Sequence, residues 1–174
     1  AMSTGVAINY AIHKVGKDYE KLLKKIFADH VGIKDTFHFM KVSWSPKDVA
    51  KGSQRYSFFA TSEDYLRIAK TIMNDYHSDS CIGDYLRFIY DNRIKKKLKD
   101  DPRRTNYQSA AATYEYGGQI HFSYKGMKDR VIFAMDGFAG QQMIIDMDNK
   151  RILIVNTIGQ HYNWNKIVYK VIKN

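Results

Sequence analysis

The chain has 174 residues, of which 44% are hydrophobic and 26% are charged, and its formal net charge at pH 7 is +10. This length and apolar content suffice for one modest domain with a core, and no apolar run approaches the roughly 20 residues that a membrane span needs. Cys81 is the single cysteine, which excludes an internal disulfide, and no zinc-ligand spacing or His-Glu-x-x-His pattern occurs. We therefore expect no metal, no other cofactor and no membrane span.

Much of the positive charge lies in one segment, residues 93–104, which reads RIKKKLKDDPRR. A basic balance is typical of nucleic-acid-binding proteins, but no recognition motif accompanies it here. The other lysines are scattered over what would be solvated helix faces. Nucleic acid is therefore not the expected partner.

Apolar residues recur at helical spacing in four segments of the first part of the chain. The helices are predicted at residues 8–15, 19–27, 65–74 and 82–90. A capping-box-like sequence at residues 61–64 opens the third helix. Between residues 37 and 59 the periodicity is weak and Pro46 and Gly52 interrupt it, so we predict a long irregular connection there.

After a Ser/Ala/Thr stretch the pattern changes from helical to alternating. The strands are predicted at residues 116–124, 131–135, 142–147 and 152–157. Short gaps between them favour antiparallel hairpins, and a tail with helical spacing at 164–172 should pack on the sheet. The expected fold is α+β within one domain: a helical region, residues 1–113, followed by a three- to four-stranded antiparallel sheet and a C-terminal helix, residues 114–174.

Several polar residues of these elements are interpreted as structural. Asp64 and Arg67 fit a capping and salt-bridge unit at the start of a helix rather than a catalytic pair. His121 alternates with apolar neighbours on a strand and is expected to be an ordinary outward residue. Cys81 has no neighbouring base and is expected to be inert.

The most informative block spans residues 133–155 and reads FAMDGFAGQQMIIDMDNKRILIV. It is typical of consecutive strands, with a glycine-rich bend at the first junction and a polar Asp148-Asn149 turn at the second. In the bend, Gly137 and Gly140 flank two uncharged residues. Glycine allows a backbone to approach a ligand closely, but it also serves a plain tight bend. Gln141 has a second interpretation too, because its side chain could simply cap strand hydrogen bonds.

This block closely resembles the last motif of serine hydrolases related to class C β-lactamases, penicillin-binding proteins and 6-aminohexanoate-oligomer hydrolases. The family's Ala-x-Gly-x-x-Gly-Gln spacing fits residues 135–141, with Met135 in the place of Ala. Three further blocks are similar to the family. They are the Ala-Thr-x-x-Asp-x-x-Arg helix start at 60–67, the Gly-Ile-Lys-Asp-Thr step at 32–36 and the Tyr-x-Tyr-Gly sequence at 114–117. The resemblance extends over nearly the whole chain.

The resemblance implies an incomplete β-lactamase/transpeptidase-like fold that lacks the family's first two catalytic motifs. No Ser-x-x-Lys occurs in the chain, and the Tyr-x-Asn motif would fall before residue 3. Acyl transfer in this family needs an activated serine, a Lys/Tyr proton shuttle and an oxyanion hole. We therefore expect the C-terminal portion of such a hydrolase, inactive alone. The alternative is a non-catalytic binding or partner module derived from the same fold.

The resemblance also assigns roles to the residues of the glycine-rich bend. The backbone N–H of Phe138 is the expected oxyanion donor. The residues expected to contact substrate are Met135, Asp136, Gly137, Gly140 and Gln141. Penicillin-recognising members carry Lys/His-Thr-Gly at residues 135–137, whereas Met-Asp-Gly offers no positive charge to a β-lactam carboxylate. An amide or ester, rather than a penicillin, is therefore the expected substrate of the intact protein.

A homo-oligomer is the last expectation. The family's sheet is completed by N-terminal strands and an N-terminal helix that this chain lacks. Their absence should leave an open edge or an uncovered apolar face, and such surfaces drive association. We expect a second copy to cover the gap.

Overall fold

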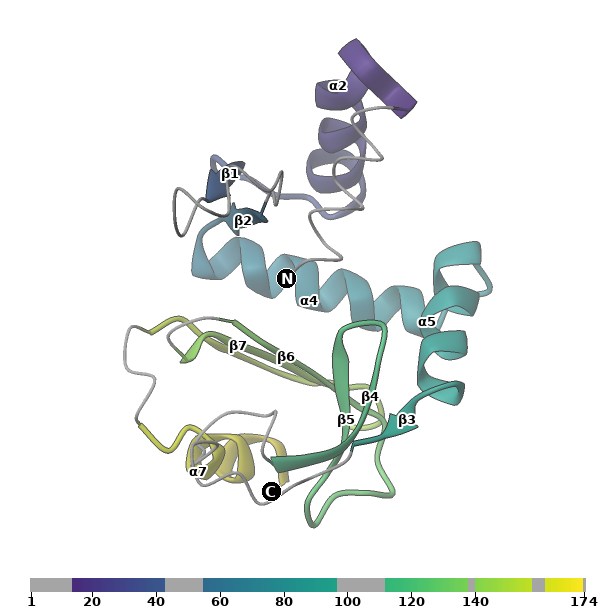
Figure 1. Ribbon diagram of the computed structural model, residues 1–174, viewed down its shortest axis with the longest axis vertical. Helices are drawn as coiled ribbons and strands as arrows, with labels where there is room; N and C mark the ends of the chain where they lie inside the picture. Colours follow the sequence, from purple (N-terminus) through teal and green to yellow (C-terminus); the bar gives the residue numbers. More distant parts are fainter. Residues whose placement is uncertain (1–13, 43–54, 97–111, 138–139, 158–161, 174) are drawn as a thin grey trace. The chain divides into compact units, whose positions relative to one another are not determined.

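The computed structural model describes residues 14–42, 55–96, 112–137, 140–157 and 162–173. The chain divides into two compact units, Ala1–Ile68 and Ala69–Asn174, and the division falls inside helix α4, Ser62–Tyr76. Helices and antiparallel sheets are both present, so the α+β class is confirmed (Figure 1). Within the described ranges no helix is both long and apolar enough to cross a membrane. Most of the helix predicted at residues 8–15 lies outside the described residues.

The first unit contains a short helical segment, a hairpin and the beginning of α4. The helical segment consists of η1 (Gly16–Asp18), α2 (Tyr19–Leu23) and the π-helix η2 (Lys24–His30). The hairpin consists of β1 (His38–Val42) and β2 (Arg55–Phe59), which pair antiparallel.

The prediction of an irregular connection between residues 37 and 59 is therefore wrong for residues 38–42 and 55–59, and residues 43–54 lie outside the described residues. Phe39 lies directly opposite Phe58, with the ring centroids 4.9 Å apart, and Phe27 stacks on Phe58 at 5.0 Å. Cross-strand and helix-to-strand aromatic pairs stabilise this hairpin. Such pairs join residues far apart in the sequence, so a periodicity within one strand does not reveal them.

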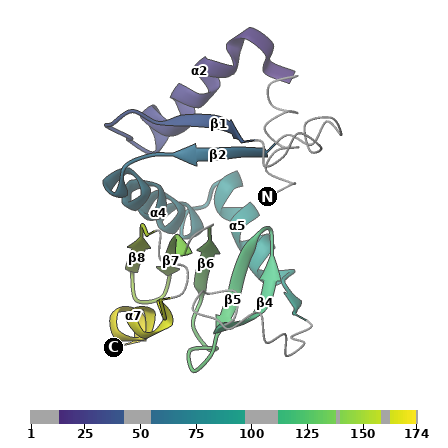
Figure 2. The ribbon, with the colours of Figure 1, turned by 60° about the vertical axis from the view of Figure 1, so that its left-hand side comes forward.

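The second unit is built around a six-stranded antiparallel sheet in which each strand pairs with the next one along the chain. The strands are β3 (Ile94–Lys95), β4 (Thr113–Gly117), β5 (Ile120–Tyr124), β6 (Ile132–Asp136), β7 (Gln142–Asp146) and β8 (Arg151–Val155). Figure 2 shows β4 to β8 side by side.

The predicted number of strands, three to four, is therefore too low. Residues 116–124 do not form one strand, because Gly118 and Gln119 turn the chain between β4 and β5 with φ of +52° and +69°. Two consecutive left-handed residues are what a tight two-residue hairpin requires. The remaining strand, β3, has only two residues, too few to show a pattern.

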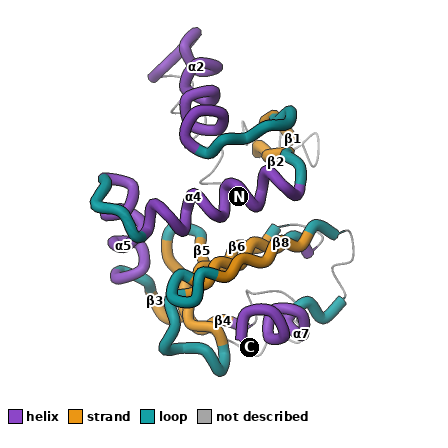
Figure 3. The backbone as a smooth tube through the Cα atoms, turned by 180° about the vertical axis from the view of Figure 1, so that it is seen from behind, coloured by secondary structure: helices purple, strands orange, loops and turns teal. Residues whose placement is uncertain are grey.

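Helices cover both faces of this sheet (Figures 1 and 3). On one face, α4 from Ala69 onward and α5 (Cys81–Asp91) pack on the fully buried Phe122 and Phe133. On the other face, α7 (Asn165–Val168) and its π-helical continuation η5 (Tyr169–Lys173) pack on Ile132 and Ile144. Because both faces are covered, β6 and β7 are apolar on both sides.

Candidate functional site

The sheet face covered by α7 and η5 carries an aspartate at each end of β6 and β7, the fully buried Asp146 and the partly buried Asp136. Asp146 ends β7 and lies opposite Ile132, whereas Asp136 ends β6 and lies opposite Gln142. Residues two apart on a strand share a face. Ile132 and Asp136 therefore share the face that carries Asp146, and we call the two regions the Asp146 end and the Asp136 end.

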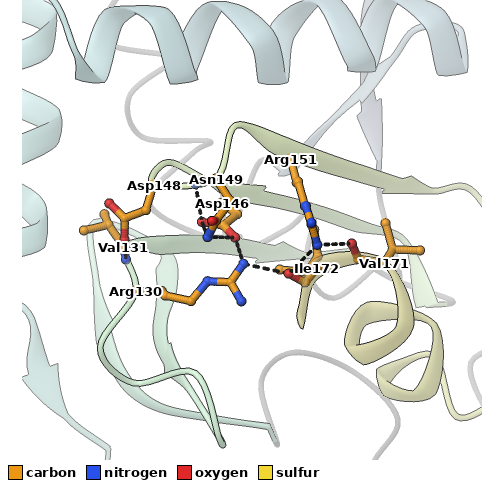
Figure 4. Close-up of polar contacts among 8 residues, drawn as sticks. All are labelled: Arg130, Val131, Asp146, Asp148, Asn149, Arg151, Val171 and Ile172. Carbon is orange, nitrogen blue, oxygen red and sulfur yellow. Dashed lines mark hydrogen bonds and ion pairs between the residues drawn. The ribbon is translucent and has the colours of Figure 1, made fainter. Parts of the chain in front are cut away.

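The Asp146 end holds the C-terminal helix against the sheet (Figure 4). The fully buried Asp146 carboxylate accepts hydrogen bonds from a guanidinium N–H of Arg130 and, at 3.1 Å, from the backbone N–H of Asn149. Arg130 also donates to the carbonyl of Ile172 at 2.6 Å, and Arg151 donates to the same carbonyl at 3.3 Å. The last carbonyls of a helix have no intrahelical partner, and here arginines satisfy them. This network serves the fold.

The Asp136 end pairs an aspartate with a histidine. Nε2 of His121 lies 3.9 Å from Oδ2 of Asp136, beyond hydrogen-bonding distance, and the two side chains are 16% and 9% exposed. The ring of Tyr116, directly across on β4, lies 4.9 Å from the imidazole. Nδ1 of His121 is buried and has no hydrogen-bond partner within the described part of the chain.

The expectation that His121 is an ordinary outward residue is therefore wrong. Alternation does place it on the face opposite Ile120 and Phe122, which belong to the cluster beneath α4 and α5. That opposite face, however, is itself largely covered. Alternation within one strand shows which residues share a face, but it does not show whether the face is exposed to solvent.

The imidazole of His121 is neutral at pH 7. Burial, together with the positive charge of Lys96, lowers the pKa of His121 from 6.5 to about 4, in spite of the nearby Asp136 carboxylate. A neutral imidazole has one nitrogen that can accept a proton or a hydrogen bond. With a pKa of about 4, His121 is a weak base at pH 7, and at the Asp136 end it can serve as a neutral hydrogen-bond acceptor.

The bend that follows Asp136 has a backbone that requires glycine at two positions. The N–H of Gly137 donates to the carbonyl of Gln141 at 2.8 Å, and a Cβ on Gly137 would lie 2.9 Å from the Cβ of Gln141. Gly140 has φ of +90°, in the left-handed region. Phe138, the expected oxyanion donor, lies outside the described residues.

Gln141 uses its side-chain amide to extend the pairing of β7 and β8. Its Nε2 donates to the carbonyl of Thr157, and its Oε1 accepts from the N–H of Thr157 at 3.2 Å. The side-chain amide thus makes the two hydrogen bonds to Thr157 that the backbone of one more paired residue would make. The capping role that the sequence left open is present, and contact with substrate stays a prediction for Gln141.

Consecutive residues of the motif lie on opposite faces of the sheet. Met135 lies opposite Met143 on β7 and packs on the cluster beneath α4 and α5. Asp136 lies on the other face, beside His121. The structure therefore brings Asp136, His121 and the glycine bend together and places Met135 apart from them.

In the first unit, two of the blocks that resemble the hydrolase family contact each other. The fully buried Asp64 accepts hydrogen bonds from the backbone N–H groups of Lys34 and Asp35, each at 3.1 Å, and from Arg67 at 2.5 Å. Thr61 accepts from the N–H of Asp64 at 3.2 Å and donates to Asp35 at 3.0 Å. Asp64 and Arg67 thus form the capping and salt-bridge unit that their spacing indicated.

Asp64 is ionised over the physiological pH range. Burial opposes the charge, but the hydrogen bonds from the N–H of Lys34, from Arg67 and from the N–H of Asp35 outweigh it and hold the pKa of Asp64 below 3.8. The charged form is therefore the one that joins the loop before β1 to the start of α4.

No group of three or more acidic, histidine or cysteine side chains in the described ranges is arranged to hold a metal ion. Comparison of the chain with protein-family models, with curated proteins and with solved structures found no match. The chain's own residues and their geometry are therefore what supports a function.

Proposed function

We propose that this chain is the C-terminal portion of a β-lactamase-like serine hydrolase and contributes one wall of an acyl-transfer site. In the intact protein a serine outside this chain attacks the carbonyl of an amide or ester and forms an acyl-enzyme, which water then hydrolyses. The backbone N–H of Phe138 is one oxyanion donor, and the Asp136 end borders the site. Without the nucleophile the chain is inactive alone.

The observation that carries this proposal is the contact between two separate blocks that resemble the same family. The aspartate of the block at 60–67 receives two backbone N–H groups from the block at 32–36. The threonine of the first block donates to the aspartate of the second. Contact between these two blocks is what a fold shared with the family would require.

The anchored bend gives the proposal its second support. The bond from Gly137 to Gln141 ties the bend to β6 and β7, and the amide of Gln141 ties it to Thr157. An oxyanion hole needs donors that are fixed before the reaction begins. Gly137 and Gln141, described residues on the two sides of Phe138, are held by these bonds.

The substrate class follows from the charge of the motif. Asp136 stands where penicillin-recognising members carry the middle residue of Lys/His-Thr-Gly, and the motif has no cation. A substrate carboxylate at this place would meet a negative charge rather than a partner. We therefore assign an uncharged or cationic amide or ester to the intact enzyme.

The test is to express the chain together with the reading frame encoded directly upstream. We expect that frame to contain Ser-x-x-Lys, and we expect hydrolysis of a p-nitrophenyl ester and labelling of that serine by a fluorophosphonate only when both segments are present. Phe138→Pro, which removes the backbone N–H, should then lower kcat by about 10²–10³-fold. The matched variant Phe138→Ala keeps the N–H and should keep most of the activity.

The alternative, a non-catalytic binding or partner module, needs no nucleophile, and the chain contains no Ser-x-x-Lys; its Tyr-x-Asn sequence at residues 90–92 closes helix α5. Translation that starts at Met2, with no Ser-x-x-Lys segment encoded upstream, would make this module the better assignment.

A further inference from the structure

The two edge strands of the six-stranded sheet are built differently. β3 has two residues, one of them Lys95, whereas β8 has five, with the sequence Arg-Ile-Leu-Ile-Val. Within the described part of the chain, β8 pairs with β7 alone and stands at one end of the row of strands (Figure 2). Short length and charged side chains protect an edge from pairing with another chain. β3 has both protections, and β8 has neither beyond Arg151 at its start.

The hydrogen-bond pattern of the sheet shows which backbone groups of β8 face the open edge. The N–H of Met147, just after β7, donates to the carbonyl of Val131, just before β6. Because hydrogen-bonded pairs alternate along antiparallel strands, the odd-numbered residues of β7 also direct their backbone N–H and C=O groups to β6. The even-numbered residues of β7 then bond to β8, where Ile144 lies opposite Leu153. It follows that Ile152 and Ile154 direct their N–H and C=O groups away from β7.

The side chains of β8 are only partly buried on both faces of the sheet. Ile152 and Ile154 pack against the cluster beneath α4 and α5, and Leu153 packs against the cluster beneath α7. All three keep part of their surface exposed. A further strand beside β8 would bury apolar surface on both faces at once.

We propose that β8 pairs antiparallel with β8 of a second copy of this chain, about a two-fold axis at Leu153. In this register Ile152 lies opposite Ile154 of the second copy, and the two exchange both of their outward backbone bonds. Leu153 faces its own equivalent. The interface is isologous, with the same strand contributed by each copy.

The occupant is a second copy because the strand is complementary to itself. Antiparallel pairing places leucine on leucine, isoleucine on isoleucine and Arg151 opposite Val155. The two arginines therefore stand at opposite ends of the pair, where like charges do not meet. Each Arg151 side chain is already turned toward η5, where it donates to the carbonyl of Ile172. The net charge of +10 per copy opposes association, so added salt should strengthen the dimer.

A covalent trap tests the register. In a Cys81→Ser background, Leu153→Cys should give a disulfide-linked dimer on mild oxidation, because directly opposite residues bring their Cβ atoms to about 4.5–5.5 Å. Ile154→Cys in the same background is the matched control. Its two copies would lie diagonally across the pair, at about 7–8 Å, and should remain unlinked.

Light scattering on the purified chain tests the interface itself. We expect a dimer, and we expect Ile154→Pro to give a monomer with unchanged secondary structure, because proline removes an outward N–H that β7 does not use. Ile154→Ala keeps that N–H and should weaken the dimer without abolishing it. A monomer at the highest soluble concentration would overturn the proposal. So would a dimer that withstands Ile154→Pro and is not trapped at position 153.

Discussion

Asp146 and Asp136 lie on the same sheet face, at opposite ends of the same two strands, yet their surroundings differ. Asp146 is fully buried and accepts hydrogen bonds from Arg130 and Asn149. Asp136 faces the neutral imidazole of His121 at 3.9 Å, beyond hydrogen-bonding distance. A buried carboxylate is stabilised by fixed cationic and amide donors.

The difference separates what the fold needs from what a site can use. Docking of the C-terminal helix and closure of the turn between β7 and β8 together explain the partners described at the Asp146 end. At the other end, His121 and Asp136 lie beside the glycine bend, where the N–H of Gly137 donates to the carbonyl of Gln141. Titratable groups whose pKa is strongly shifted by burial cluster at functional sites, and His121 is such a group. The comparison therefore favours the Asp136 end as the functional one.

The largest effect should come from the Asp146 end. Asp146→Asn leaves Arg130 beside a neutral amide in a largely buried place and should lower the free energy of unfolding by about 3 kcal/mol. Urea denaturation monitored by circular dichroism measures the loss. Asp148→Asn, in the same turn, is the matched control. Asp148 is exposed and accepts one bond from Val131 at 2.7 Å, so its loss should stay below about 1 kcal/mol. Equal losses would contradict a special role for Asp146.

Lowering the pH should destabilise the folded chain through His121, at the Asp136 end. The pKa of His121 is about 4 in the folded chain and 6.5 when unperturbed, so the unfolded state binds the proton more tightly. Stability is therefore full above pH 6.5 and falls as the pH drops towards 4, by up to about 3 kcal/mol. His121→Gln should remove this dependence, whereas His30→Gln, at an exposed position, should keep it.

The pH range over which His121 affects stability differs from the range over which Asp64 does. Because the pKa of Asp64 lies below 3.8, its contribution is present above that pH and is lost as the pH falls further. Unfolding measured at pH 7 and at pH 5 therefore reports on His121 and not on Asp64. A stability that does not change between these two pH values would contradict the neutral buried imidazole.

A smaller effect is expected at the bend. Gln141→Ala removes both hydrogen bonds to the backbone of Thr157 and should lower the free energy of unfolding by about 1–2 kcal/mol. Gln141→Glu keeps the acceptor for the N–H of Thr157 but loses the donor to its carbonyl. We expect it to be intermediate at neutral pH. If both variants unfold like the unsubstituted chain, the bend is not anchored through Gln141.

Long amphipathic elements could be predicted from the sequence, because their own side chains carry the pattern. The helices expected at residues 65–74 and 82–90 correspond to α4 and α5, and the strands expected at 131–135, 142–147 and 152–157 correspond to β6, β7 and β8. In these segments apolar residues recur every three to four residues on one side of a helix, or run continuously along a strand that is buried on both faces.

Features that depend on the partner of a segment could not be predicted. The β1–β2 hairpin rests on rings that meet across strands, such as Phe39 and Phe58. The turn between β4 and β5 rests on a left-handed Gln119, a conformation that a non-glycine residue rarely adopts. The burial of His121 depends on side chains from neighbouring strands, such as Tyr116 on β4 and Asp136 on β6, and the pattern of its own strand does not show them.

An assay of ester hydrolysis by the purified chain alone is the most direct test of the central claim, that the chain contributes part of an acyl-transfer site but not its nucleophile. With a p-nitrophenyl ester and a chromogenic cephalosporin we expect background rates, and we expect a fluorophosphonate to label none of the chain's serines. The matching positive measurement is the same assay with the upstream segment present. Turnover by the chain alone that disappears when one of its own serines is replaced by alanine would contradict the account.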